Sequence, residues 1–302
     1  MRPQKSQRDR RFKVGTQPVA SEKKEKVKKV TIQGVTGCFH EAAARNYFAG
    51  EEIETVPCQT FKELFNTMAR ESDYYGIVAI ENTIAGSLLQ NYELLRASEL
   101  QIIGEYKLRI SHVLAALKGQ NIEDLKEVNS HPIALAQCDN FLNAHPHLKV
   151  VEKDDTAGSA KEIAENNLIG HAAICAEIAA EYYNLNILEK GIETNKRNFT
   201  RFLILANANK TENTATIPGI NKASLVFSLP HAHGSLSKIL TIFSFYDINL
   251  TKIESMPIIG CEWEYRFYVD VTFDNYVRYR QSLTAITPLT KSFRILGEYK
   301  EF

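Results

Sequence analysis

The most constraining feature of this sequence is a regular alternation of strand-like and helix-like segments over residues 28–193. Short apolar runs typical of β-strands are followed by turns and then by segments with helical periodicity. The first unit reads, in order, KKVTIQGV, TGCFHEAAARNYFAG, TVPCQT, TFKELFNTMARESD, YYGIVAIEN, TIAGSLLQNYELLRAS and LQIIGEYKLRISHVLAAL. This β-α-β-α-β order predicts an α/β protein with parallel sheets whose strands are connected by crossover helices.

A second α/β unit follows, made of VNSHPIALAQCDNFLNAHP, KVVEKDDTAGSAKEIAENN, HAAICAEIAAEYYNL and NILEKGIE. The apolar strand Phe199–Leu205 comes after this unit, and we expect it to return to the sheet of the first unit. Two α/β lobes joined by crossing strands leave a cleft between them. Small anions bind in such clefts, at strand ends and helix starts.

The sequence changes in character over residues 222–302. Its strand and helix patterns there follow the order β-α-β-β-α-β, which predicts a ferredoxin-like domain. We therefore divide the chain into a leader of residues 1–27, a main body of residues 28–209, a polar linker of residues 210–221 and this C-terminal domain.

Charge is distributed unevenly along a chain whose formal net charge is zero. Residues 1–29 contain eleven Lys and Arg against three acidic residues, a net charge of +8, so the remaining chain carries −8. A basic tail of this kind can contact nucleic acid or a membrane surface. We favour the alternative that the tail is a disordered, solvated leader, and we expect no nucleic-acid partner.

The sequence contains no signal for export or for metal binding. The leader lacks the apolar core of a signal peptide, and no later run reaches about 18 apolar residues, so we expect no membrane partner. The five cysteines are scattered without a CxxC spacing, which indicates buried thiols in the reducing cytoplasm. The eight histidines lack metal-ligand spacing, so we expect no metal site.

Three turn-to-helix junctions carry small and hydroxyl-bearing residues that suit an anionic ligand. The first holds Asn82, Thr83 and Gly86, the second Ser130 and His131, and the third Thr156, Ala157, Gly158 and Ser159. Helix starts present unpaired backbone N–H groups and a favourable dipole to a carboxylate. An ordinary capped helix would look the same at any one junction, but the three together indicate a cleft for a small polyanion.

The stretch KRNFTRFLIL places Thr200 and Arg201 at the start of a core strand. In a regular strand, Thr200 and Phe202 share one face and Arg201 points to the other. Arg201 therefore either anchors the lobes or reaches a ligand carboxylate through an irregular strand start. A nucleotide cofactor is not expected, because GVTGCF is neither a G-x-G-x-x-G nor a Walker sequence.

From Val30 to Phe302 these segments resemble prephenate dehydratase. GVTGCFHEAA is similar to the family's opening Gly-Pro-x-Gly-Thr-Phe segment, ENTIAGSLLQNYELL to its Glu-Asn-Ser-x-x-Gly segment, and SHPIALAQC and DTAGSAKEIA to its two later helix starts. NFTRFLIL carries the family's Thr-Arg-Phe signature. The sequence departs from the family pattern at Val35, Cys38, Thr83 and Thr194.

The resemblance implies a two-lobed, periplasmic-binding-protein-like catalytic region that converts prephenate to phenylpyruvate, with loss of water and carbon dioxide, in phenylalanine biosynthesis. It implies no cofactor. Thr200 matches the family's catalytic threonine. A free hydroxyl is a poor acid, so we expect it to act through a hydrogen bond that strengthens as charge grows on the leaving oxygen. The substrate contacts implied are Asn82, Thr83, Gly86, Ser130, His131, Thr156, Ala157, Gly158, Ser159, Arg201 and Phe202.

The C-terminal domain resembles the ACT domain with which family members sense phenylalanine. GSLSKIL stands for the family's Gly-Ala-Leu segment and NLTKIESMP for its Glu-Ser-Arg-Pro segment. The resemblance implies feedback inhibition and a homodimer or homotetramer, with phenylalanine contacts from His233, Gly234, Ser235, Leu236, Glu254 and Ser255. Met256 replaces the arginine common in the family. The charge of that arginine is therefore absent, and we expect this to weaken either phenylalanine binding or the signal from this domain to the catalytic lobes. The alternative is an ACT domain retained only for dimerisation.

Two other functions are compatible with the sequence. Arogenate dehydratase performs the same chemistry on the aminated substrate. A non-catalytic, amino-acid-sensing binding protein would use the helix-start anion contacts but would not need Thr200.

Overall fold

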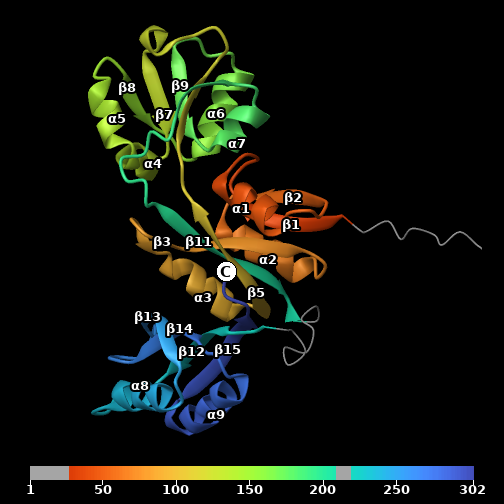
Figure 1. The fold of residues 1–302 in the computed structure, drawn as a ribbon, viewed down its shortest axis with the longest axis vertical. Helices are drawn as coiled ribbons and strands as arrows, with labels where there is room; N and C mark the ends of the chain where they lie inside the picture. The colour runs from red at the N-terminus through yellow and green to blue at the C-terminus, as the bar shows by residue number, and fades with distance from the viewer. Residues whose placement is uncertain (1–26, 209–218) are drawn as a thin grey trace, which may run out of the picture.

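The structure, a computed structural model, describes residues 27–208 and 219–302. The expected leader and most of the expected linker therefore lie outside the described residues. Three layers are stacked along the long axis of the molecule (Figure 1), which we call the second lobe, the first lobe and the C-terminal domain. Each layer is built on its own β-sheet.

The first lobe contains a six-stranded sheet in the order β2-β1-β3-β11-β5, with the short β4 paired to β3. Its strands are β1 (Lys28–Gln33), β2 (Ile53–Cys58), β3 (Tyr75–Asn82), β4 (Gly86–Ser87), β5 (Leu100–Arg109) and β11 (Phe199–Asn207), and its helices are α1 (Phe39–Tyr47), α2 (Phe61–Arg70) and α3 (Leu89–Ala97).

The second lobe contains a five-stranded sheet in the order β10-β6-β9-β7-β8. Its strands are β6 (Val113–Ala116), β7 (Glu127–Ser130), β8 (Lys149–Glu152), β9 (His171–Cys175) and β10 (Asn186–Lys190), and its helices are α4 (Pro132–Gln137), α5 (Asp139–Ala144), α6 (Thr156–Glu165), α7 (Glu177–Tyr182) and the 3-10 turn η1 (Ile122–Asp124).

The C-terminal domain has a four-stranded antiparallel sheet in the order β13-β14-β12-β15. It follows the order β12 (Lys222–Ser228), α8 (Ser235–Phe245), β13 (Asn249–Pro257), β14 (Tyr265–Thr272), α9 (Tyr276–Ile286), η4 (Thr287–Leu289) and β15 (Ser292–Tyr299). This is the ferredoxin-like arrangement that the sequence pattern predicts.

The expectation of purely parallel sheets is only partly correct. Strands β2, β1 and β3 are parallel, but β11 runs antiparallel to both β3 and β5. The reason is the path of the chain: β11 enters the first sheet from the second lobe, at the end where β3 and β5 finish. The chain crosses from the first lobe to the second after β5 and returns before β11. These two crossing segments lie side by side, since the N–H of Ile110 in the first donates to the carbonyl of Asn198 in the second at 2.8 Å.

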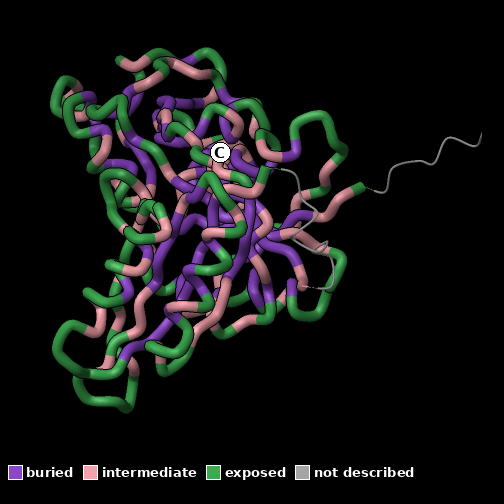
Figure 2. The backbone as a smooth tube through the Cα atoms, turned by 60° about the horizontal axis from the view of Figure 1, so that its bottom comes forward, coloured by how far each residue is buried: buried purple, intermediate pink, exposed green. Residues whose placement is uncertain are grey.

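Two hydrophobic clusters join the layers. In Figure 2 the buried residues are concentrated in the central strands, and the turns are exposed. One cluster contains Ile32 and Ile77 of the first lobe together with Ala115 and Ala173 of the second lobe. The other joins first-lobe residues to Val226, Tyr268 and Leu296 of the C-terminal domain. Helices α8 and α9 cover the opposite face of the C-terminal sheet.

Candidate active site

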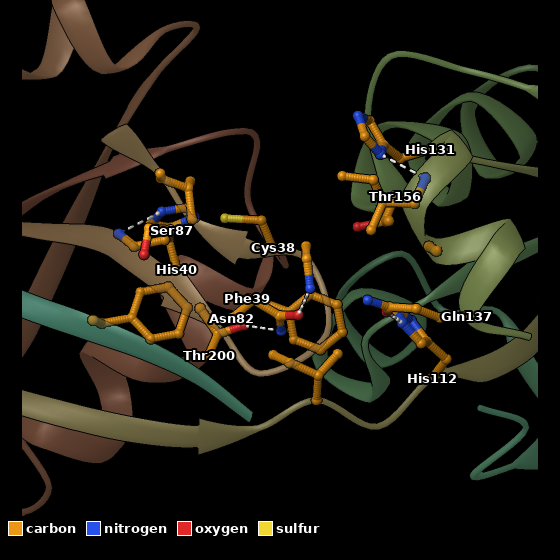
Figure 3. Close-up of a pocket in the computed structure, with 17 residues that line it drawn as sticks. Cys38, Phe39, His40, Asn82, Ser87, His112, His131, Gln137, Thr156 and Thr200 are labelled. Carbon is orange, nitrogen blue, oxygen red and sulfur yellow. Dashed lines mark hydrogen bonds between the residues drawn. The ribbon is translucent and has the colours of Figure 1, made fainter. Parts of the chain in front are cut away.

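A cavity of about 350 Å³ lies between the two lobes, where β3 and β11 meet the helix starts of the second lobe (Figure 3). The first lobe lines it with Cys38, Phe39, His40, Ala79, Asn82, Ala85, Ser87, Leu88, Thr200 and Phe202; the crossing contributes Ile110 and His112; and the second lobe contributes His131, Ile133, Ala134, Gln137 and Thr156.

Asn82 and Thr200 form the polar centre of the first-lobe wall. They are partners in the β3–β11 ladder, and the side-chain Nδ2 of Asn82 donates to Thr200 Oγ1 at 2.9 Å. The orientation of this amide is fixed, because its Oδ1 accepts hydrogen bonds from the backbone N–H groups of Ile84 and Ala85 at 2.9 and 2.8 Å. The Thr200 oxygen is therefore an acceptor toward Asn82, and its own proton is available to another acceptor.

An aromatic contact supports the same wall. The ring of Phe202 lies nearly perpendicular to the imidazole of His40, with ring centroids 5.0 Å apart. His40 Nε2 accepts a hydrogen bond from the backbone N–H of Ala79 at 3.3 Å, so that nitrogen carries no proton. Burial lowers the pKa of His40 to about 3, and the ring is therefore neutral at ordinary pH.

The opposite wall is formed by the second lobe and the crossing. His131 and Thr156 stand at the starts of α4 and α6, across the cavity from Thr200 (Figure 3). His112 Nε2 lies 2.9 Å from Gln137 Oε1, and the His112 backbone N–H donates to the Glu193 carboxylate at 3.0 Å. Burial lowers the pKa of His112, so this ring also favours its neutral form.

The cavity is mainly apolar. Within the described ranges, the residues that line it include no Asp, Glu, Lys or Arg. Burial raises the pKa of the Cys38 thiol to about 12, so Cys38 is not a thiolate nucleophile. The site therefore offers hydroxyl, amide and neutral imidazole groups in a low-dielectric pocket.

The structure brings together five of the residues that the sequence predicts for the site. Asn82, His131, Thr156, Thr200 and Phe202 all line the cavity. They come from four separate segments of the chain: the end of β3, the starts of α4 and α6, and β11.

The other predicted contacts do not line the cavity in this structure. Ser130 is fully buried and donates to the carbonyl of Ile174 at 2.6 Å, while Ala157 is buried in the interlobe core. The N–H of Gly158 is already bonded to the Asp155 side chain at 2.6 Å, because Asp155 caps α6, and the Ser159 hydroxyl donates to the Asp155 carbonyl.

Thr83 lies in the exposed turn that follows β3, beside the cavity wall, and Gly86 is the first residue of β4 after that turn. The Thr83 hydroxyl donates to the carbonyl of Arg197 and accepts from the N–H of Phe199, so it holds the turn against β11. Gly86 pairs with Asn82 in the β3–β4 ladder and has a φ of +84°, which favours glycine.

Arg201 is an anchor between domains, and the prediction that it contacts substrate is wrong in this structure. Its side chain is 6% exposed and points away from the cavity. Arg201 Nε bonds to Glu105 at 2.7 Å, another nitrogen bonds to Asp270 of β14, and a third donates to Tyr299 Oη at 3.0 Å. Burial opposes the charge of Glu105, yet Arg201 and Lys222 hold its pKa below the ordinary value.

Sequence reasoning missed much of the cavity lining. His40 follows the opening glycine-rich turn, whereas His112 and Gln137 come from the crossing and from α4. The edge-on contact between the rings of Phe39 and His112, 5.3 Å apart, depends on the packing of the two lobes. His40 and Gln137 lie within the GVTGCFHEAA and SHPIALAQC segments that carry the resemblance. These segments are the signal from which both residues could have been predicted to line the site.

A second cavity, of about 150 Å³, lies at the start of α8 in the C-terminal domain. Its lining consists of Leu229, Pro230, His231, Ala232, Ser235, Leu236, Trp263, Tyr265 and Phe267. Among the predicted effector contacts, Ser235 and Leu236 line this cavity, and His233 and Gly234 lie in the exposed turn before the helix.

Glu254 and Ser255 do not line the second cavity of the single chain, so their contact with phenylalanine stays a prediction. The Glu254 side chain points to the first lobe, where its Oε1 accepts from the Ser87 hydroxyl at 2.5 Å. Ser255 is exposed on the opposite face of β13, as the alternation of a strand requires. Met256 also faces the first lobe and packs against the hydrophobic cluster there.

The described residues hold neither a metal-binding cluster nor a membrane-spanning helix. Among residues 27–208 and 219–302, no group of three or more His, Cys, Asp or Glu residues could hold a metal ion. No helix in those ranges is long and apolar enough to cross a membrane.

The fold and the cavity define a two-lobed α/β protein with room for a small molecule at the junction of its lobes. The family model described as prephenate dehydratase matches residues 30–210 of the chain. The chain therefore belongs to the prephenate dehydratase family, and its fold is the periplasmic-binding-protein-like fold of the solved members.

Two of the similar proteins described next are named for this family, and a third is named for a different activity. The protein named arogenate dehydratase/prephenate dehydratase 2, chloroplastic, from Arabidopsis thaliana, is 41% identical over 90% of this chain and 72% of its own length. A prephenate dehydratase structure in complex with L-Phe, from Arthrobacter aurescens, has a TM-score of 0.80 and 29% identity, covering 90% of this chain and 89% of that one. A structure described as GqqA, a quorum quenching acylase, has a TM-score of 0.82 and 28% identity, covering 91% and 98%.

Proposed function

We propose that this protein is a prephenate dehydratase, which converts prephenate to phenylpyruvate with loss of water and carbon dioxide. The observation that carries the proposal is the hydrogen bond from Asn82 to Thr200. Because the Thr200 oxygen accepts from the amide, the hydroxyl proton can be donated to an oxygen in the cavity. A dehydration needs such a donor at the leaving hydroxyl group.

The reaction requires two bonds to break. The bond between the ring and the departing carboxylate supplies the electrons that complete the aromatic ring, and the ring C–O bond breaks to release the hydroxyl group. That group leaves as water after it gains one proton, which solvent supplies, because the Thr200 hydroxyl is too weak an acid to give up its own. The hydrogen bond from Thr200 strengthens as negative charge grows on the departing oxygen. A preorganised donor of this kind therefore stabilises the transition state more than the bound substrate.

The apolar lining of the cavity suits the loss of the carboxylate. Ala79, Leu88, Ile110, Ile133 and Ala134 all face this space. A carboxylate that enters such a space exchanges its water shell for fewer partners, and this favours the neutral product carbon dioxide. The carboxylate that is retained would lie against the second-lobe wall, where Thr156, His131 and Gln137 offer polar groups.

Arogenate is the second candidate substrate. The Arabidopsis relative is named for both activities, and a relative from Petunia hybrida is named arogenate dehydratase 2. The two substrates share the ring hydroxyl and the departing carboxylate, so the same Asn82–Thr200 pair would serve either of them.

We further propose that the C-terminal domain is an ACT domain that senses phenylalanine in the second cavity. Leu229, Leu236 and Phe267 offer apolar contacts there, and α8 begins beside it at Gly234, whose φ is +73°. The Arthrobacter prephenate dehydratase, which was solved in complex with L-Phe, supports this ligand. Exposed Phe245, Ile259 and Trp263 on this domain support assembly into a homodimer or homotetramer.

The location of the protein stays a prediction. Four of the five cysteines are buried as free thiols and Cys261 is exposed, which suits a reducing compartment such as the cytoplasm. Four Arabidopsis relatives carry the word chloroplastic in their names, which points to a different compartment.

Purified protein assayed with prephenate and, separately, with arogenate tests the proposed function. We expect phenylpyruvate from prephenate without added metal or nucleotide. Turnover of arogenate alone would replace the first candidate by the second. Tight binding of either compound by folded protein, without turnover, would make the chain a binding protein and refute the enzymatic proposal.

A further inference from the structure

Ser87 connects the cavity wall to the C-terminal domain. It lines the cavity and forms half of the two-residue strand β4 (Figure 3). Its hydroxyl accepts a hydrogen bond from Lys252 Nζ at 2.8 Å and donates one to Glu254 Oε1 at 2.5 Å. Both partners belong to β13, so the hydroxyl of a wall residue of the active-site cavity is held by side chains of another domain.

Lys252 is placed to hold this contact in one geometry. Its side chain is 12% exposed, and its ammonium group bonds to the carboxylate of Glu81 and to Ser87, with Glu254 Oε1 at 3.4 Å. An ammonium group has three N–H donors, and these three acceptors match that number. The ring of Tyr92 lies 5.9 Å from the same nitrogen.

Residues 82–88 connect Ser87 to the Asn82–Thr200 pair, so the position of Ser87 affects the geometry of that pair. Ser87 pairs with Glu81 and Gly86 pairs with Asn82 in the β3–β4 ladder. Asn82 in turn holds the N–H groups of Ile84 and Ala85 within the turn. A shift of Ser87 therefore changes the turn whose geometry orients the Asn82 amide, and with it the Thr200 hydroxyl.

Strand β13 is also next to the second cavity. It lies at the edge of its sheet and pairs with β14, where Ser255 is opposite Phe267 and Pro257 is opposite Tyr265. Phe267 and Tyr265 both line the second cavity. The β13–β14 pair thus contacts a wall residue of the interlobe cavity and supplies wall residues of the second cavity.

We propose that Lys252 and Glu254 are positioning residues for the reaction: by holding Ser87 they set the geometry of the 82–88 turn and of the Asn82–Thr200 pair. Through the same contact, a conformational change in the C-terminal domain changes the position of Ser87 in the cavity wall. The inference rests on the proposed use of the interlobe cavity as the substrate site.

The test compares Lys252→Met with Lys222→Met. Lys222 is a matched control, because it is a buried lysine at the same domain boundary, where it bonds to Glu105 at 2.9 Å without touching Ser87. We expect Lys252→Met to lower kcat about tenfold with little change in KM, since a small misplacement of reacting groups costs rate. Lys222→Met should keep the wild-type kcat per folded molecule, and Lys252→Arg should restore part of the loss.

Amide hydrogen exchange provides a readout that does not depend on substrate. In Lys252→Met the N–H groups of Ile84 and Ala85 should exchange faster, whereas Lys222→Met should leave them protected. Wild-type protein that turns over neither substrate would refute the proposed function while leaving this comparison intact. Equal exchange in the two variants, or equal loss of kcat per folded molecule, would overturn the positioning role.

Discussion

Asn82 donates its side-chain amide to Thr200 Oγ1 at 2.9 Å, and the two residues are also direct partners in the β3–β11 ladder. Backbone pairing sets the distance between them, and the bonds from Ile84 and Ala85 set the orientation of the amide. The threonine proton is thereby directed to a different acceptor. The proposed mechanism depends on this arrangement.

Asn82→Asp tests the orientation of the hydroxyl. The change keeps the acceptor for Ile84 and Ala85 but replaces the donor to Thr200 with a second acceptor, which would attract the threonine proton. We expect kcat to fall about 100-fold with a smaller change in KM, the size found when one preorganised donor is removed. Asn66→Asp on the exposed face of α2 controls for the added charge. A near-normal kcat in Asn82→Asp would show that the amide does not orient the hydroxyl.

Arg201→Leu tests the interdomain anchor. The substitution leaves the carboxylates of Glu105 and Asp270 buried without their main partner, and breaking a buried pair in this way costs about 3–5 kcal/mol. Urea unfolding should show that loss. Arg278→Leu, which removes an exposed pair with Asp247, should cost less than about 1 kcal/mol. Similar costs for the two variants would mean that the Arg201 network does not stabilise the fold.

The strand β11 illustrates how much the sequence predicts. Alternation along the strand places Thr200 and Phe202 on one face and Arg201 on the other, and the structure confirms it, with Phe202 and Ile204 in the interlobe core and Leu203 and Leu205 in the core shared with the C-terminal domain. The destination of Arg201 was not predictable, because its partner Asp270 comes from a domain whose docking depends on tertiary packing.

The helix starts show the opposite limit. The residue types at Asp155–Ser159 predict a capped helix correctly, but capping consumes the Gly158 amide that an anion would otherwise use. Of that segment, Thr156 is the residue that lines the cavity. The sequence shows which backbone N–H groups stand at a helix start. It does not show which of them are already bonded to a capping side chain.

Gly297→Ala tests how closely the C-terminal domain is docked. A methyl carbon added at Gly297 would lie 2.2 Å from the carbonyl oxygen of Ile102 in β5. A backbone atom in a sheet cannot move aside, so we expect a cost of about 1–3 kcal/mol and a lower Tm. Gly76→Ala is the comparison, because its methyl would meet the flexible side chain of Met68 instead. Gly76→Ala being the more damaging change would contradict the close docking.

The pH dependence of stability tests the neutral state of His40. Its pKa is lowered from the ordinary 6.5 to about 3 by burial, so the unfolded chain binds the proton more readily than the folded one. The stability that neutral His40 contributes is complete above about pH 6.5 and is lost as the pH falls toward about 3. Between pH 7.5 and 5.0, wild type should lose more unfolding free energy than His40→Gln, by about 2 kcal/mol.

His147→Gln serves as the control for that experiment, since His147 is exposed on the second lobe. Its comparison with wild type shows what the loss of an exposed imidazole does by itself. An identical pH dependence for wild type and His40→Gln would show that the His40 ring is not held neutral by the fold.

The kcat of Thr200→Val with prephenate, measured beside Thr200→Ser, tests the central claim most directly. Valine keeps the shape of threonine and removes only the hydroxyl, whereas serine keeps the hydroxyl. We predict a loss of about 10²–10⁴-fold in kcat for Thr200→Val, with weaker effects on KM, and substantial activity in Thr200→Ser. A folded Thr200→Val protein with near-normal kcat would contradict the account, because the Thr200 hydroxyl would then not assist the departure of the ring oxygen.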